Sequence, residues 1–267
     1  MTNVVAERMW RRFTPAQRVT RFLVYLALVA AVVVSLQTIE VIPEFLADAP
    51  EQVIDLLTRM WPIDIASYPQ GVHAALMETI HIASLGTLLA LVLALPVGLL
   101  AAHNICPYTA VNVLAKLILV SSRSVNSLVW ALLFVGIFGP GALAGTLAIA
   151  FRSIGFVGKL FGEALEETHA GTIEALDAAG APGLSLLTFG YWPQVKPAFW
   201  SIALFRWDIN VRESAVLGLV GAGGIGMTLD AALNLFQWQR VATILLAIFV
   251  VVIVAEILVT VVRKRIL

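Results

Sequence analysis

The sequence is poor in charged residues, cysteine and histidine. Only 13% of its 267 residues are Asp, Glu, Lys or Arg, whereas a soluble globular domain carries about a quarter. Lys and Arg together number 17, as do Asp and Glu, so no excess of positive charge indicates a nucleic-acid partner. With 60% hydrophobic residues and a mean hydropathy of +0.93, the composition indicates an integral membrane protein.

The residues that most often bind metals or form disulfides are scarce. A single cysteine, Cys106, excludes an internal disulfide. No two of the four histidines stand at the spacing of metal ligands. They are His73, His81, His103 and His169. The sequence therefore predicts no metal site and no cofactor in this chain.

Apolar runs long enough to cross a membrane recur along the chain. Crossing about 30 Å of hydrocarbon takes roughly 20 apolar residues in a helix. We predict six spans, at about 22–40, 78–102, 113–138, 141–160, 198–220 and 241–262. The predicted fold class is all-α, a polytopic membrane protein with six transmembrane helices.

Charge is distributed unequally between the predicted loops. The N-terminus carries Arg8, Arg11, Arg12, Arg18 and Arg21, and the C-terminus ends in a basic run at 263–265. The segment 41–72 between the first two spans is acidic, with Arg59 as its one basic residue. By the positive-inside rule, both termini are cytoplasmic and segment 41–72 is external. A signal peptide is the alternative for the N-terminus, but the long apolar run favours a retained helix.

The external segment contains an amphipathic stretch. Residues 51–61 place most of their apolar side chains on one helical face, which predicts an interfacial helix or a docking surface for an external partner. We divide the chain into two parts. Residues 1–75 hold the cytoplasmic N-terminal segment, the first span and this external segment. Residues 76–267 hold the other five helices.

The longest polar interruption of the C-terminal half is EALDAAGAPGLSLLTFGYWPQVKP, residues 174–197. Its glycines and prolines predict a short helix, a turn around Pro182 and a second short helix closed by Pro193 and Pro197. Counted from the N-terminus, the loop lies on the cytoplasmic side between spans four and five. A simple connector between two spans is the alternative interpretation.

Residues 218–230, GLVGAGGIGMTLD, contain two patterns that imitate nucleotide-binding motifs. One is G-x-G-x-x-G, and the other is a P-loop in which Met227 replaces the lysine. The first requires a preceding strand and a later acid, and the second loses its phosphate contact without the lysine. We interpret the glycines as a tight break after span five that lets backbones approach. Because no other such motif exists, any ATPase must be a separate chain.

Charged residues inside the predicted spans mark either a pathway or a set of ion pairs. In span five, Arg206, Asn210 and Glu213 share one helical face, and Asp208 and Arg212 form an i, i+4 pair. All five positions belong to the middle or outer half of the membrane.

Two arginines in other spans extend this set. Arg152 in span four lies at a depth similar to that of span five's charges, and Arg123 in span three lies nearer the cytoplasm. Guanidinium groups suit phosphate-like oxyanions, and we expect Arg212 to make the main contact. Alternatively, the charges only pair with one another, and an Asp208–Arg212 pair would favour that. We expect Glu256 in span six to pair with a basic residue such as Arg123.

Two stretches of the chain resemble a known family. The spacing of Glu174-Ala175, Gly180 and Pro193 resembles the EAA signature of ABC-importer membrane subunits. The stretch RWDINVR, followed by VLGLVGAGGIG, is similar to the membrane subunit of phosphonate ABC importers. The likeness extends from about Glu78 to the basic C-terminus, about 190 of the 267 residues.

The resemblance implies a type I, binding-protein-dependent ABC-importer fold in the cytoplasmic (inner) membrane. It implies a homodimer of permeases, two cytoplasmic ATPase subunits that bind ATP and Mg, an external substrate-binding protein, and phosphonate or phosphate-like substrates. Residues of about 165–197 would couple to the ATPase. The expected coupling residues are Glu174, Ala175, Asp177, Gly180 and Pro193.

Other functions are less consistent with the sequence. An ABC-importer permease for another small solute is one alternative. An enzyme acting on lipid phosphates would need an acid cluster or a nucleophile–base pair, which the chain lacks. An ion channel would explain the buried charges but not the loop at 174–197.

Overall fold

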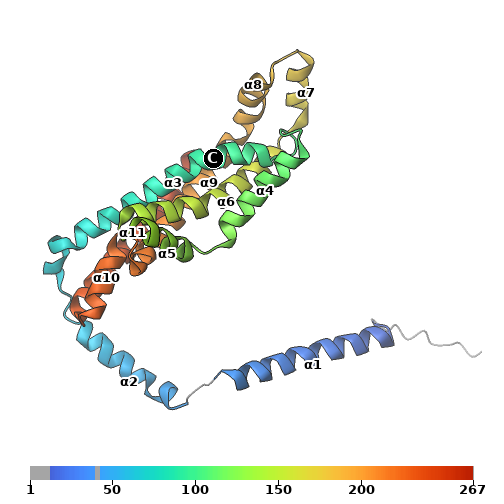
Figure 1. Cartoon of the computed structure of the whole chain (residues 1–267). Coiled ribbons are helices and arrows are strands. Elements are labelled where there is room, and N and C mark those ends of the chain that lie inside the picture. Colours follow the sequence, from blue (N-terminus) through green and yellow to red (C-terminus); the bar gives the residue numbers. More distant parts are fainter. Residues whose placement is uncertain (1–12, 40–42, 267) are drawn as a thin grey trace, which may run out of the picture. The chain divides into compact units, whose positions relative to one another are not determined.

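The computed structural model describes residues 13–39 and 43–266, and within these ranges the chain is helical with no strand (Figure 1). The long helices are α1 (Pro15–Thr38), α2 (Pro43–Met60), α3 (His73–Ala101), α4 (Thr109–Ser124), α5 (Ser127–Phe138), α6 (Ala142–Glu166), α9 (Trp192–Leu217) and α11 (Trp238–Ile266). Shorter elements are η1 (Ile65–Ser67), η2 (Tyr68–Val72), α7 (Ala170–Ala178), α8 (Gly183–Ser185), η3 (Leu186–Tyr191), η4 (Gly218–Val220) and α10 (Ile225–Asn234).

The chain separates into two compact units, and the boundary along the sequence falls between Leu56 and Leu57. The first unit contains α1, which begins with a capping box between Thr14 and Gln17 and has no buried residue. Arg18 and Arg21 lie in α1, whereas the other three N-terminal arginines fall outside the described residues. The amphipathic stretch predicted at 51–61 lies in α2, whose apolar side chains are largely exposed.

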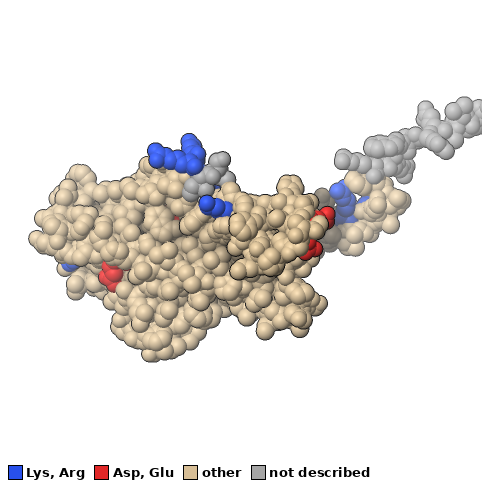
Figure 2. Space-filling view, turned by 90° about the horizontal axis from the view of Figure 1, so that it is seen from above, with Lys and Arg blue, Asp and Glu red and all other residues tan. Residues whose placement is uncertain are grey.

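Each of the six predicted spans coincides with helix in the structure. Four helical stretches are long and apolar enough to cross a membrane. The number of spans rises to six if each of two bent pairs of helices is counted as one span. The four are Pro15–Thr38, Ile65–Ala101, Ala142–Glu166 and Trp238–Arg265. Figure 2 shows that most of one face of the molecule consists of uncharged side chains, which suits contact with lipid.

The third predicted span is not one continuous helix. The chain bends by 89° between α4 and α5. Val125 is extended, and the Oδ1 of Asn126 accepts a hydrogen bond of 3.1 Å from the Leu128 N–H, which caps the start of α5. The predicted span 113–138 therefore consists of two helices, because the cap restarts the helix in a new direction.

The second helix predicted in the loop also differs. The turn around Pro182 is present, but the chain is helical from Gly183 through η3 into α9, so the two later prolines do not close a short helix. Pro193 lies in the first turn of α9, where a missing N–H leaves no bond unmade, and Pro197 lies inside that helix.

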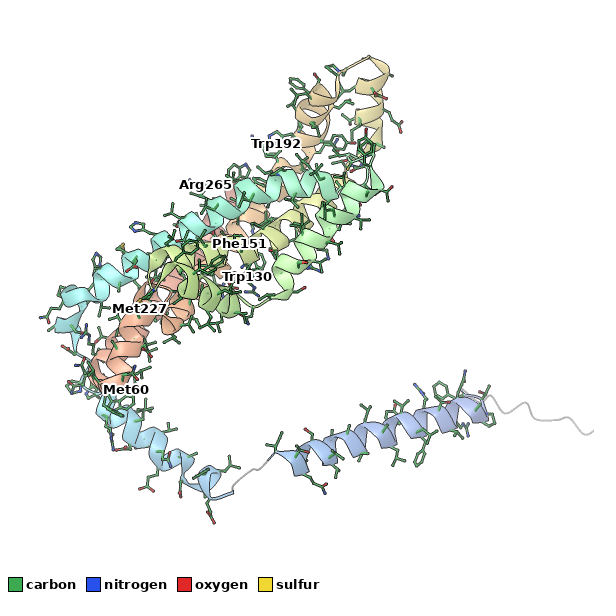
Figure 3. All side chains as sticks on the ribbon, in the orientation of Figure 1. Met60, Trp130, Phe151, Trp192, Met227 and Arg265 are labelled. Atoms are coloured by element: carbon green, nitrogen blue, oxygen red, sulfur yellow. The ribbon has the colours of Figure 1, made fainter. Side chains whose placement is uncertain are left out.

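In the second unit, α6 packs against α3, α4, α5 and α9. Small residues allow these backbones to come close together. A Cβ atom added at Gly155 of α6 would overlap the Leu119 carbonyl oxygen of α4. Aromatic rings then hold α5 on α6, and Figure 3 shows Trp130 and Phe151 next to each other, with ring centroids 5.4 Å apart.

The glycine-rich stretch after α9 forms the predicted break. Gly221, Gly223 and Gly224 all have positive φ angles, which residues other than glycine rarely adopt. A Cβ at Gly223 would come within 2.7 Å of the Ala142 backbone nitrogen at the start of α6. The stretch follows a helix rather than a strand, so it forms neither of the nucleotide-binding motifs that it imitates.

Candidate functional site: a charged cluster between α6 and α9

The charged residues predicted in spans four and five come together inside the second unit. Arg152 lies ten residues into α6, about 15 Å along it, and Arg206 lies about 21 Å along α9. Both positions are near the middle of helices that pack against each other. The cluster consists of Arg152, Arg206, Asp208, Arg212 and Glu213.

Glu213 bridges two of these arginines. Its Oε2 lies 3.3 Å from Nη2 of Arg206, and its Oε1 accepts from Nη1 of Arg152. The Arg206 side chain is 4% exposed, Glu213 18% and Arg152 30%. The carboxylate therefore connects an enclosed guanidinium on its own helix to a more accessible one on α6.

Arg206 and Asn210 are buried and hold the helices together in this conformation. The Nε of Arg206 donates to Ser153 Oγ at 2.8 Å. Asn210 is fully buried; it donates to Thr87 Oγ1 at 2.8 Å and accepts from Ser153 at 3.3 Å. Asn210 thus connects α9 to both α3 and α6, a set of partners that its sequence position did not indicate.

The predicted i, i+4 ion pair between Asp208 and Arg212 is present. The Asp208 side chain is only 8% exposed, whereas Arg212 is 49% exposed. The second carboxylate oxygen of Asp208, Oδ1, is buried without a hydrogen-bond partner among the described residues. Arg212 is therefore the more accessible member of a pair that is charge-neutral in this conformation.

A cavity of about 340 Å³ lies beside the cluster. Arg152, Arg212 and Glu213 line it together with the start of α5, and Ser127 Oγ lies 3.5 Å from Nη1 of Arg152. In the sequence, Asn126 and Ser127 belong to the predicted third span and follow Arg123 by three and four residues. The bend between α4 and α5 instead brings both residues to the arginines, and an Asn that caps an apolar helix is the signal that could have located it.

Arg123 does not join this cluster. It lines another cavity, of about 280 Å³, together with Lys116 and Lys159, two residues that the sequence analysis did not single out. Each lysine lies near a glutamate of α6, Lys159 at 3.3 Å and Lys116 at 3.8 Å. Arg123 takes part in none of the ion pairs found among the described residues. The expected pair with Glu256 is therefore wrong, because Glu256 is exposed on α11.

Four of the five expected coupling residues lie on a helical hairpin at one end of the second unit, where α7 and α8 stand out from the bundle (Figure 1), and the fifth, Pro193, lies in the first turn of α9. They are all exposed: Glu174, Ala175, Asp177, Gly180 and Pro193. Leu184 and Phe189 on the same hairpin are exposed apolar side chains that the sequence analysis missed. The surface of the hairpin therefore combines acids with apolar groups.

The hairpin has a defined internal structure. Gly180 ends α7 with a φ of 78°, and its N–H donates to the Asp177 carbonyl at 2.8 Å. The His169 N–H donates to Gln194 Oε1 at 2.9 Å, which attaches the start of α7 to α9. A Cβ at Gly190 would come within 3.3 Å of the Leu176 side chain. The glycine thus lets the two arms of the hairpin pack closely.

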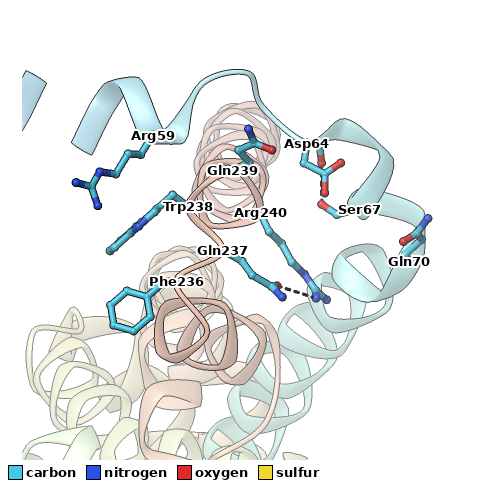
Figure 4. A pocket seen from close by; sticks show the side chains of 9 residues that line it. All are labelled: Arg59, Asp64, Ser67, Gln70, Phe236, Gln237, Trp238, Gln239 and Arg240. Atoms are coloured by element: carbon cyan, nitrogen blue, oxygen red, sulfur yellow. Dashed lines mark hydrogen bonds between the residues drawn. The ribbon is translucent and has the colours of Figure 1, made fainter. Parts of the chain in front are cut away.

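The largest of these cavities, about 520 Å³, lies at the opposite end of the second unit, between the chain preceding α3 and the start of α11 (Figure 4). Nη1 of Arg240 donates to Gln237 at 3.4 Å, and its Nε is buried without a hydrogen-bond partner in the described part of the chain. Thr243 donates to the Asp64 carbonyl at 2.8 Å, which fixes that segment to α11. Among the described residues, no group of three or more His, Cys, Asp or Glu is arranged to hold a metal.

Comparison with known proteins identifies the family. The profile of the family described as "Binding-protein-dependent transport system inner membrane component" matches residues 94–267. This chain belongs to that family. The inner membrane component is a transport subunit rather than an enzyme, and ATP is hydrolysed by a separate chain.

Two relatives of this inner membrane component carry informative names. It is 40% identical over 213 residues to the phosphite transport system permease protein PtxC of Stutzerimonas stutzeri, covering 80% of this chain and 77% of that protein. This chain is also 38% identical over 237 residues to the phosphate-import permease protein PhnE of Mycolicibacterium smegmatis. The aligned region covers 89% of this chain and 44% of that longer protein.

Solved structures confirm the fold. A chain of the inward-facing MetNI methionine ABC transporter aligns with a TM-score of 0.63 and 20% identity, covering 73% of the inner membrane component and 96% of that chain. The predicted all-α, type I importer fold is confirmed. At that identity the similarity concerns the fold alone.

Proposed function

We propose that this chain forms the pathway through which an ABC importer moves phosphate-type oxyanions, such as phosphate, phosphite or phosphonates, across the cytoplasmic membrane. The observation that carries the proposal is the composition of the cluster between α6 and α9. Three guanidinium groups lie with two carboxylates beside a cavity, so one positive charge has no counter-charge within the cluster. Relatives named for phosphite and phosphate transport support the same substrate class.

An unbalanced charge inside a membrane protein is unfavourable because little water is there to solvate it. A monoanion in the cavity would balance the cluster. Arginine presents parallel N–H donors that match two oxygens of a phosphate or phosphonate group. Oxyanions of a single negative charge therefore fit the site better than neutral or cationic solutes.

The residues of the cluster take different parts in this proposal. Arg152 and Arg212 line the cavity and contact the anion, while Arg206 and Asn210 hold α9 in position from behind. Asp208 neutralises Arg212 until the anion arrives. Arg123 lines the other cavity with two lysines and would receive the anion on its way to the cytoplasm.

The hairpin of α7 and α8 is the proposed contact with the ATPase. Two ATPase subunits that bind ATP and Mg would each engage one copy of the permease in a homodimer. Glu174, Ala175 and Asp177 are exposed on α7, and Gly180 and Pro193, which are also exposed, are the other proposed coupling residues. Movement of the hairpin would be transmitted through η3 into α9, which carries four of the five charges of the cluster.

An external substrate-binding protein is the proposed partner at the other end. By the positive-inside rule, the basic run at 263–265 supports a cytoplasmic end of α11. Because α11 is 29 residues long, about 43 Å, its start at Trp238 then lies at the outer surface. The cavity around Arg240 opens there, and the exposed apolar side chains of α1 and α2 would contact membrane lipid.

The test is uptake by the complete importer reconstituted in proteoliposomes, with radiolabelled phosphate, phosphite and methylphosphonate compared with methionine. We expect oxyanion uptake by the wild type and at least a tenfold loss with Arg212→Gln, because a charged hydrogen bond of about 1.5 kcal/mol or more is removed. Arg265→Gln, at the exposed end of α11, is the control and keeps normal uptake. Uptake of methionine without oxyanions would instead support a permease for another solute.

A further inference from the structure

Glu213 holds a position that a transported anion would also need. We propose that its carboxylate is an internal ligand of Arg152 which the oxyanion displaces, so that Glu213 sets how tightly the permease holds its substrate. This inference rests on the proposed oxyanion transport and assigns a role to a residue that would otherwise only link two helices.

The two oxygens of Glu213 have different surroundings. Oε2 faces Arg206, whose guanidinium is enclosed and also donates to Ser153. Oε1 faces Arg152, which lines the cavity and whose other hydrogen bond, to Ser127 at 3.5 Å, is long. Glu213 is therefore the one close anionic partner of Arg152 among the described residues, and this contact can be reached from the cavity.

The exchange requires little rearrangement. A carboxylate and a phosphate-type oxyanion offer a guanidinium the same kind of acceptor oxygens. If an oxyanion replaces Oε1 at Arg152, Glu213 keeps its contact with Arg206 through Oε2. Arg212, half-exposed on the same cavity, supplies further donors to the oxyanion. The cluster then contains three cations and three anions, so the exchange balances its charge.

A carboxylate attached to the site competes with the substrate at every moment. Transport through a membrane requires binding that is favourable enough for entry and weak enough for release. A tethered competitor has a high effective concentration and so lowers the apparent affinity of the site. Glu213 would thereby promote release of the anion when the permease opens to the cytoplasm.

The alternative role for Glu213 is purely structural, as a link between α6 and α9. The two roles predict opposite effects of removing its charge. A structural link predicts looser helix packing with unchanged or weaker anion binding. An internal competitor predicts tighter anion binding, because Arg152 then lacks its carboxylate.

The experiment measures equilibrium binding of radiolabelled inorganic phosphate to the permease–ATPase complex in lipid nanodiscs, without the binding protein. Glu213→Gln keeps the size of the side chain and an acceptor oxygen for Arg206 but removes the charge. We expect its affinity for phosphate to rise at least about tenfold, the value of one charged hydrogen bond. Glu256→Gln, in α11 outside the cluster, is the matched control and leaves the affinity unchanged.

Two further variants keep the test decisive. Glu213→Asp retains the charge but is too short to reach both arginines, so a smaller rise is expected even if Glu213→Gln fails to fold. Adding Arg152→Gln to Glu213→Gln removes the site of competition, and the gain in affinity disappears.

The outcomes separate this inference from the proposed function. Oxyanion uptake by the wild type, with unchanged or weaker phosphate binding in folded Glu213→Gln and Glu213→Asp, overturns the competitor role alone. An importer that takes up no phosphate, phosphite or methylphosphonate overturns the proposed function and this inference with it.

Discussion

Removal of the Asn210 side chain tests how strongly hydrogen bonds between helices stabilise the charged cluster. Asn210 is fully buried on α9 and hydrogen-bonds to Thr87 of α3 and Ser153 of α6. Ser153 also receives the Nε hydrogen bond of Arg206. Replacement of Asn210 by Ala therefore breaks contacts among three helices and loosens the support of a buried guanidinium.

The size of the effect follows from these contacts. Hydrogen bonds between helices in a membrane protein average about 0.6 kcal/mol each. Two of them are lost, and the void left by the amide adds about 1 kcal/mol. Thr87 keeps its own hydrogen bond of 2.6 Å to the Ala83 carbonyl, so no hydroxyl donor is stranded there. We expect Asn210→Ala to lower the free energy of unfolding by about 2 kcal/mol.

The assay is reversible unfolding of the purified permease by SDS titration in mixed micelles. Asn234→Ala is the control, because Asn234 is exposed and its side chain donates to Asp230, one turn earlier on α10. The control should change stability by less than about 0.5 kcal/mol. Equal stability of the two variants would refute the conclusion that Asn210 connects α3, α6 and α9.

Two further predictions concern the proposed partners. Glu174→Lys reverses a charge on the exposed face of α7, and we expect it to abolish uptake and the stimulation of ATPase activity by loaded binding protein. Normal stimulation would exclude Glu174 from the coupling contact. Arg240→Glu reverses the charge in the cavity at the start of α11, and we expect it to weaken docking of the binding protein about tenfold or more. The basal ATPase activity should stay unchanged, and unaltered docking, measured by surface plasmon resonance, would place the contact elsewhere.

The structure shows that only some of the arginines predicted to line the pathway are accessible from a cavity. Of the three arginines expected at mid-membrane, Arg152 and Arg212 line a cavity, whereas Arg206 is enclosed. The Asp208–Arg212 pair exists, so a substrate has to compete for Arg212 as well. Pairing and pathway are therefore compatible interpretations, because the pairs lie at the wall of the cavity.

The sequence by itself determined the features that depend on local composition and spacing. Apolar runs of about 20 residues must become helices in a bilayer, where every backbone N–H and C=O needs an internal partner. The turn after α7 follows from Gly180, and the Asp208–Arg212 pair follows from a helical spacing of four residues. Such features depend only on residues that are close together in the sequence.

The tertiary structure decided which residues from different helices meet. Close packing of α6 against α4 at Gly155 fixes which face of α6 turns to its other neighbours, and on α9 Arg152 meets Glu213. Across the bend at Asn126, Trp130 packs on Phe151 of α6 and donates to the Ser122 carbonyl of α4 at 3.3 Å. Contacts of this kind depend on how whole helices are rotated and bent relative to one another. The hydropathy and residue spacing of a single segment predict neither the rotation nor the bending.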